Sequence, residues 1–112
     1  DGLIGYRLTG DPQGITKDFI EWGNRQPAPT LALDTPSGVE LTAGQVHTPA
    51  MKARATLTLA LPKKGLYEEE VQRYRGELYL GDISVPRVLY TNPGLELKVP
   101  DLFVESDVLR LP

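Results

Sequence analysis

The sequence predicts an α/β protein with a mostly parallel sheet, and three observations support that fold class. Residues 30–33 form an apolar and β-tolerant run, which is typical of a strand covered on both faces in a parallel sheet. A helix pattern precedes this run and a strand-like segment precedes the helix, which gives the β-α-β order of a parallel pair. The run ends at Asp34, and open parallel sheets bind ligands at the carboxyl ends of their strands.

The elements before Asp34 follow from local patterns. Residues 3–4 are expected to end a first strand, and a glycine turn follows them. Residues 13–25 are expected to form an amphipathic helix, because apolar residues recur on one face at helical spacing. These apolar residues are Ile15, Phe19, Ile20 and Trp22. Asp11 and Pro12 predict the start of this helix, since Asp caps free N–H groups and Pro is tolerated in the first turn.

The elements after Asp34 continue the alternation of strands and helices. Pro36 and Gly38 end the strand at Asp34, because neither residue continues a central strand. The further expected elements are a turn at 42–44, a helical turn at 49–54, strands at 56–61, 77–80 and 102–104, a short helix at 68–74 and a terminal helix capped by residues 105–107.

Composition restricts the class of protein. The chain has 112 residues, of which 40% are hydrophobic and 24% are charged, as in one small globular domain. A net charge of −3 does not favour nucleic acid or an anionic membrane as a partner. The chain lacks cysteine and has one histidine, His47, which excludes thiolate and multi-histidine zinc sites within it. These features fit a cytoplasmic setting, which we expect.

Asp34 and Ser37 are the strongest candidate site residues, although the same pair could merely cap the turn after the strand. Residues 5–11 lie between a strand and a helix, where phosphate loops occur, but they match neither the dinucleotide glycine fingerprint nor a Walker loop. Lys63 and Lys64 follow an expected strand. Two interpretations are open: the lysines bind an anionic ligand, or they belong to a solvated basic turn.

Several motifs in order resemble the NAD(P)H-hydrate epimerase family, whose domain is the YjeF-type N-terminal domain. They begin with Asp-Gly-Leu-Ile-Gly at 1–5, Thr-Gly at 9–10, Asp-Thr-Pro-Ser-Gly at 34–38 and Thr-Ala-Gly at 42–44. They continue with Lys-Lys-Gly-Leu at 63–66 and Gly-Asp-Ile-Ser-Val-Pro at 81–86. The resemblance covers nearly the whole chain and corresponds to the second half of the family's domain.

The resemblance implies a fold, an activity and a set of site residues. The fold would be a Rossmann-like three-layer α/β/α sandwich. The protein, commonly a homodimer in this family, would interconvert the R and S epimers of hydrated NADH and NADPH. Asp34 would be the catalytic acid–base group and would contact substrate. Asp1 and Ser37 would bind a potassium ion. The loop that wraps the substrate would consist of Gly5, Tyr6, Arg7, Leu8, Thr9, Gly10 and Asp11.

The resemblance also has departures and alternatives. The family's glycine- and asparagine-rich loop is absent from this sequence, so we expect an incomplete sheet, half a site and no activity from residues 1–112 alone. Residues 1–104 are assigned to the epimerase domain and residues 105–112 to a tail or linker, which leads to a dehydratase domain in many bacterial members. The alternatives are a non-catalytic binding or scaffold module and an unrelated nucleotide- or sugar-binding domain.

Overall fold

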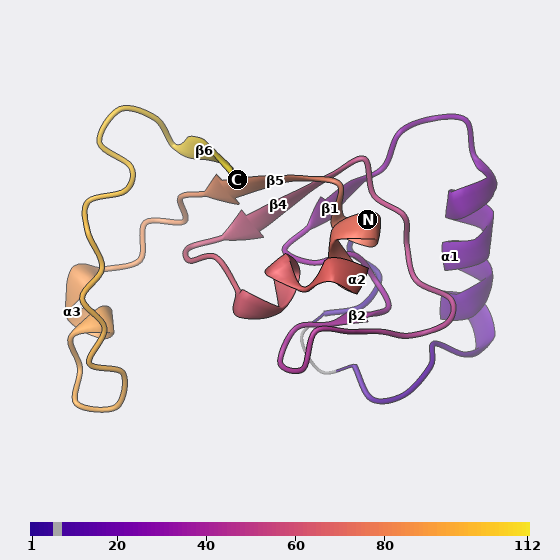
Figure 1. The fold of residues 1–112 in the computed structure, drawn as a ribbon, viewed down its shortest axis with the longest axis horizontal. Helices are drawn as coiled ribbons and strands as arrows, with labels where there is room; N and C mark the ends of the chain where they lie inside the picture. The colour runs from indigo at the N-terminus through magenta and orange to yellow at the C-terminus, as the bar shows by residue number, and fades with distance from the viewer. Residues whose placement is uncertain (6–7) are drawn as a thin grey trace.

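A four-stranded sheet forms the centre of the computed structural model, which describes residues 1–5 and 8–112 (Figure 1). The strand order is β1-β4-β5-β6; β1, β4 and β5 are parallel, and β6 is antiparallel to β5. A small antiparallel hairpin of β2 and β3 lies outside this sheet. The prediction of an α/β fold with a mostly parallel sheet is therefore confirmed.

The described elements agree with most of the expected ones. The helix at 13–25, the strands at 30–33, 56–61 and 77–80, the turn at 42–44 and the helix at 68–74 are all found, with shifts of one or two residues at most ends. The elements are α1 (Gly14–Arg25), β1 (Leu31–Leu33), β2 (Val39–Glu40), β3 (Gln45–Val46), β4 (Ala55–Leu59), the 3-10 helix η1 (Lys64–Tyr67), α2 (Glu69–Arg75), β5 (Glu77–Gly81), α3 (Arg87–Tyr90) and β6 (Val108–Leu111).

One face of the sheet carries the core. Leu66 of η1 and Val71 of α2 are fully buried and pack with Leu78 of β5 in one apolar cluster. Buried Arg75 joins these elements, since its Nε donates to the carbonyl of Leu66 at 2.6 Å and its own carbonyl accepts from Thr56 Oγ1 at 2.7 Å. The helices over this face are therefore held by both apolar packing and buried hydrogen bonds.

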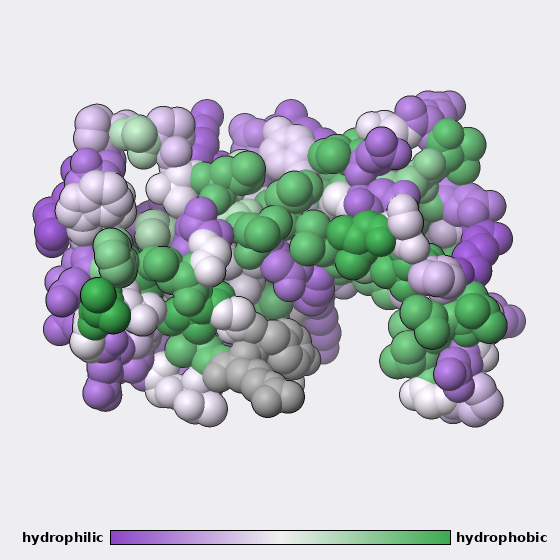
Figure 2. Space-filling view, turned by 180° about the vertical axis from the view of Figure 1, so that it is seen from behind, coloured by the Kyte–Doolittle hydropathy of each residue, from purple (hydrophilic) through white to green (hydrophobic). Residues whose placement is uncertain are grey.

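The other face of the sheet is open. Leu31 and Leu33 of β1 are 56% and 54% exposed, so the expectation that this strand is covered on both faces is wrong for the described residues. The view from behind shows a band of apolar side chains across the middle of the molecule (Figure 2). The physical reason is the position of α1, which packs beside residues 50–52 rather than over the sheet. A second helical layer, as in a three-layer sandwich, is not formed by the part of the chain described here.

The predicted apolar stripe of α1 is present but mostly unburied. Of its four residues only Ile20 is buried, while Ile15, Phe19 and Trp22 are exposed. Asp11 does not cap this helix, because the N-cap position is Gln13 and no side chain caps it. Asp11 instead accepts from the backbone N–H of Thr48, which removes its carboxylate from the helix end.

The strand expected at 3–4 is not formed, and only Asp1, before these residues, pairs with β1. The Asp1 amino group donates to the carbonyl of Leu31 at 2.7 Å, and Leu33 N–H donates to the carbonyl of Asp1 at 2.9 Å. This is the pattern of a parallel partner on the free edge of β1. Pairing stops there because the N–H of Ile4 turns to the hydroxyl of Ser37 at 3.0 Å.

Three other expected elements are wrong. Residues 49–54 form no helical turn, because their N–H groups bond to Ser37, Tyr74 and Thr30 in three different parts of the chain. Residues 102–104 are not a strand, and residues 105–107 begin no helix. The terminal segment is instead β6, in which Leu109 and Leu111 alternate with exposed Val108 and Arg110 and pair with β5. The division at residue 104 concerns domain organisation and stays a prediction.

Replacing Leu66 with alanine tests the assignment of the core. We expect Leu66→Ala to lower the free energy of unfolding by about 2–5 kcal/mol, because it removes a fully buried side chain and leaves a cavity. The matched control is Leu95→Ala at a residue that is 57% exposed, where a change within about 0.5 kcal/mol is expected. Urea denaturation measures both values, and equal losses would show that the core is misplaced.

Candidate functional site

Parallel pairing of β1 with β4 determines where Asp34 lies. The two strands run in register from Leu31 opposite Ala55 to Leu33 opposite Leu57, so both end at the same edge of the sheet. Asp34 follows directly and extends the ladder by one bond, from its N–H to the carbonyl of Leu57 at 2.8 Å. Its φ of 65° is left-handed, a conformation that Asp tolerates better than most residues, and it ends the strand.

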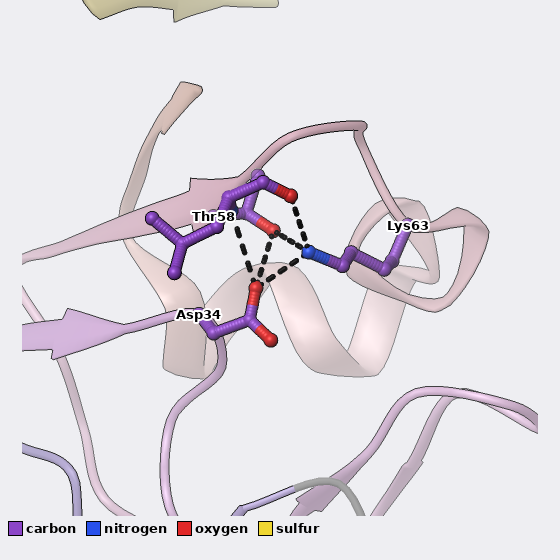
Figure 3. Close-up of polar contacts among 4 residues, drawn as sticks. Asp34, Thr58 and Lys63 are labelled. Atoms are coloured by element: carbon purple, nitrogen blue, oxygen red, sulfur yellow. Dashed lines mark hydrogen bonds and ion pairs between the residues drawn. The ribbon is translucent and has the colours of Figure 1, made fainter. Parts of the chain in front are cut away.

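One carboxylate oxygen of Asp34 receives three hydrogen bonds. Lys63 Nζ lies 2.5 Å from Oδ1, and Thr58 Oγ1 and the N–H of Leu59 each lie 3.2 Å from it (Figure 3). Within the described residues no hydrogen bond reaches Oδ2. The site therefore anchors Asp34 through one oxygen and leaves the other to accept a proton or a hydrogen bond from a ligand.

Lys63 has neither of the two roles weighed from the sequence. Its Nζ also donates to Thr58 Oγ1 at 3.0 Å and to the carbonyl of Leu59 at 2.7 Å, so three acceptors surround the ammonium group. It is therefore neither a solvated turn residue nor free to bind an anion, whereas Lys64 is exposed. Sequence reasoning missed this pair, although both residues follow adjacent parallel strands and so emerge at one edge.

The Asp34 carboxyl group is ionised at neutral pH. Partial burial alone would raise its pKa, but the hydrogen bond and the charge of Lys63 lower it, as do the bonds from Leu59 and Thr58. The net result is a pKa below the usual value of 3.8. A carboxylate of this kind stabilises positive charge well and is a weak base.

Asp1 and Ser37 form a second polar cluster on the other side of the Asp34 turn. Ser37 Oγ donates to Asp1 Oδ1 at 2.7 Å, and the backbone N–H of Ser37 donates to Asp1 Oδ2 at 2.7 Å. The structure therefore brings together the two residues expected to share an ion. The same turn carries Thr35, whose buried Oγ1 has no hydrogen-bond partner in the described part of the chain.

Gly38 fixes the position of Ser37. Its φ is 97°, and an added Cβ would lie 2.6 Å from the carbonyl oxygen of Pro49, so only glycine fits there. The segment after the hairpin is held against this turn by the N–H of Met51, which donates to the Ser37 carbonyl at 2.7 Å. Fully buried Ser37 is thus positioned by backbone packing as well as by Asp1.

The loop expected to wrap the substrate is described in part. Tyr6 and Arg7 lie outside the described residues, so the expectation for them stays a prediction. At the end of the loop, Asp11 Oδ1 lies 3.0 Å from the N–H of Thr48 and 3.2 Å from His47 Nδ1. The bond from Thr48 lowers the pKa of Asp11. Because His47 N–H donates to the carbonyl of Gly38, this loop end is tied to the Ser37 turn.

A cavity that sequence reasoning did not find lies farther along the same sheet edge. It has a volume of about 360 Å³, and its lining includes Ala60 after β4, Asp82 after β5 and Arg87 of α3. Ala60 lines this cavity and directly follows Leu59, whose N–H donates to the Asp34 carboxylate. The cavity is therefore one residue away from a hydrogen-bond partner of Asp34. The residues that follow parallel strands are the sequence signal that could have indicated this cavity, because ligands bind at the carboxyl ends of such strands.

The described residues contain neither a cluster of metal-binding side chains nor a membrane-spanning helix. Residues 1–5 and 8–112 contain no group of three acidic, histidine or cysteine side chains that is arranged to hold a metal ion. No helix among them is both long and apolar enough to cross a membrane.

Comparison with known proteins finds relatives whose names all refer to NAD(P)H-hydrate. The chain is 42% identical over 96 residues to the NAD(P)H-hydrate epimerase of Dehalogenimonas lykanthroporepellens, and this match covers 86% of the chain and 38% of the relative. It is 40% identical to the NAD(P)H-hydrate epimerase of Truepera radiovictrix, over 86% of the chain and 42% of the relative. It is 38% identical to the bifunctional NAD(P)H-hydrate repair enzyme Nnr of Coxiella burnetii, over 85% of the chain and 20% of the relative.

The matched part of the chain therefore spans less than half the length of each of these relatives. The family described as YjeF-related protein N-terminus matches residues 1–65, which include the Asp1–Ser37 cluster and the Asp34–Lys63 pair. With this match and with relatives at about 40% identity, the chain belongs to the YjeF-related protein N-terminus family.

Proposed function

We propose that the protein containing this chain interconverts the R and S epimers of hydrated NADH and NADPH. The observation that carries the proposal is the Asp34–Lys63 pair at the carboxyl edge of a parallel sheet, in a chain whose relatives are named NAD(P)H-hydrate epimerases. An open parallel sheet places its ligand at this edge. Asp34 and Ser37, two polar residues of the turn after β1, both lie there.

Asp34 would act on the hydrated nicotinamide ring. Epimerisation requires the hydroxyl group to leave the ring carbon and return from the opposite face, and the ring carries positive charge in between. The ionised carboxylate stabilises that charge. The hydroxyl group takes a proton from solvent and leaves as water, and the water that returns gives a proton to Oδ2 of Asp34 as its oxygen bonds to the ring carbon. The low pKa of Asp34 favours charge stabilisation as the larger of these two contributions.

Asp1 and Ser37 would bind a potassium ion. Hard cations take oxygen ligands, and this cluster offers a carboxylate and a hydroxyl group whose oxygens are 2.7 Å apart. The residues present therefore fit part of a ligand shell. The ion would supply positive charge at this turn.

Further assignments accompany this proposal. Residues 5–11 would contact the nucleotide, because their described end is tied to the Ser37 turn. A homodimer would bury apolar surface such as the exposed Ile15, Phe19 and Trp22 of α1. A dehydratase, linked or separate, would consume one epimer, and the setting would be the cytoplasm. Residues 1–112 alone would be inactive, since they span a minor part of each relative.

The substitution Asp34→Asn tests the catalytic role in the intact protein. We expect the rate of conversion of pure R-NADPH hydrate to the S epimer to fall about 10²- to 10³-fold, because the amide carries no negative charge. The control is Asp107→Asn, an exposed aspartate beyond the site, which should leave the rate unchanged. Chromatographic separation of the epimers measures both rates. A folded wild-type protein that gives no acceleration would favour the non-catalytic module.

Potassium dependence tests the second cluster. We expect Ser37→Ala to raise the potassium concentration for half-maximal activity by about tenfold or more, a change of roughly 1.4 kcal/mol in binding. Ser106→Ala is the matched control, because among the described residues this exposed hydroxyl bonds only with Val108. Rates are measured against potassium chloride with tetramethylammonium chloride holding the ionic strength constant. An identical potassium curve in wild type and Ser37→Ala would remove the proposed ion from this cluster.

A further inference from the structure

The turn after β4 brings Lys63 back over the end of its own strand. Leu61 N–H donates to the carbonyl of Leu59 at 2.8 Å, and Ala60 adopts a left-handed φ of 64° while its N–H bonds to Gly81. On the far side, the carbonyl of Lys63 accepts from Leu66 N–H at 3.1 Å and begins η1. The backbone on both sides of Lys63 is thus fixed by the sheet and by a buried helical turn.

The ammonium group of Lys63 has a complete set of acceptors. Its three hydrogens correspond to three oxygens, those of Asp34 Oδ1, Thr58 Oγ1 and the Leu59 carbonyl, at 2.5, 3.0 and 2.7 Å. Thr58 in turn donates its own hydroxyl hydrogen to Asp34 Oδ1. Each hydrogen of this network has one acceptor, so the arrangement of Asp34 is defined by its partners (Figure 3).

We propose that Lys63 is a positioning residue that holds Asp34 by Oδ1 and thereby presents Oδ2 to the substrate. The proposal rests on the proposed function, in which Asp34 is the group that touches the nicotinamide ring. It goes further by assigning Lys63 a role in the reaction through Asp34 rather than through contact with an anionic ligand. Thr58 completes the arrangement by bonding both partners.

The charge of Lys63 also determines how Asp34 titrates. Among the described residues, the groups that contact its carboxylate are the Lys63 ammonium, the Thr58 hydroxyl and the Leu59 N–H, and only the first is charged. Without that charge, partial burial would raise the pKa of Asp34. Since Asp34 acts when ionised, activity lost on acidification would then be lost at a higher pH than in the wild type.

Two substitutions separate charge from position. Lys63→Met removes the charge and all three donors, so it should raise the pKa of Asp34 and lower kcat by about 100-fold. Lys63→Arg keeps the charge, but a planar guanidinium cannot direct three donors as an ammonium group does. It should therefore leave the pKa of Asp34 low and still reduce kcat. Lys64→Met, at the exposed neighbouring lysine, is the matched control and should change neither quantity.

The measurements are made on the intact protein with two independent readouts. Carbon-13 NMR of the aspartate carboxyl groups, with the Asp34 signal assigned by its loss in Asp34→Asn, follows the titration without substrate. Rates of epimer interconversion against pH give kcat, KM and the acidic limb of the profile. An upward shift of the Asp34 titration in Lys63→Met, together with the same shift of the acidic limb, is the expected result.

The outcomes distinguish this inference from the proposed function. A wild-type protein without epimerase activity would overturn the proposed function, while an unshifted NMR titration in Lys63→Met would overturn the role of Lys63. Unchanged kcat in Lys63→Met would also overturn it, even with a shifted titration. If Lys63→Met does not fold, as judged by circular dichroism, Lys63→Arg decides: wild-type kcat in that variant would show that the three-way placement is not needed.

Discussion

The parallel pairing of β1 with β4 is the constraint on which the rest of the structure depends. Because both strands end at one edge, Asp34 at the end of β1 meets Thr58, Leu59 and Lys63 from the end of β4 and the turn that follows. On the free side of β1, the backbone bonds of Asp1 to Leu31 and Leu33 place its carboxylate next to the Ser37 turn. A register shift of one residue would exchange the two faces of the strand and separate these partners.

The two faces of the sheet are covered unequally. The packed face holds Leu66, Val71 and Leu78 in the core, and it supports the turn that carries Lys63. The open face leaves Leu31 and Leu33 exposed, and α1 leaves most of its apolar stripe exposed as well. Exposed apolar surface of this extent is typical of an interaction site.

The orientation of the Asp34 carboxylate depends on the geometry of its hydrogen bonds more than on the strength of its ion pair with Lys63. The side chains of Lys63 and Asp34 remain 27% and 35% exposed, so their Coulomb attraction is screened by solvent. Thr58 and Leu59 add directional bonds that select one carboxylate oxygen. The result is an ionised carboxylate with a defined orientation, as the proposed reaction through a cationic intermediate requires.

The sequence by itself determined the α/β class, most of the helices and strands, and Asp34 as the end of a strand, because apolar periodicity and the breaks at Pro36 and Gly38 are local signals. It also placed Ser37 and Asp1 together through family motifs. Only the tertiary structure decided that Lys63 joins Asp34, that β6 replaces an expected helix, and that α1 leaves one sheet face open. These outcomes depend on contacts between segments far apart in the chain, which no local pattern contains.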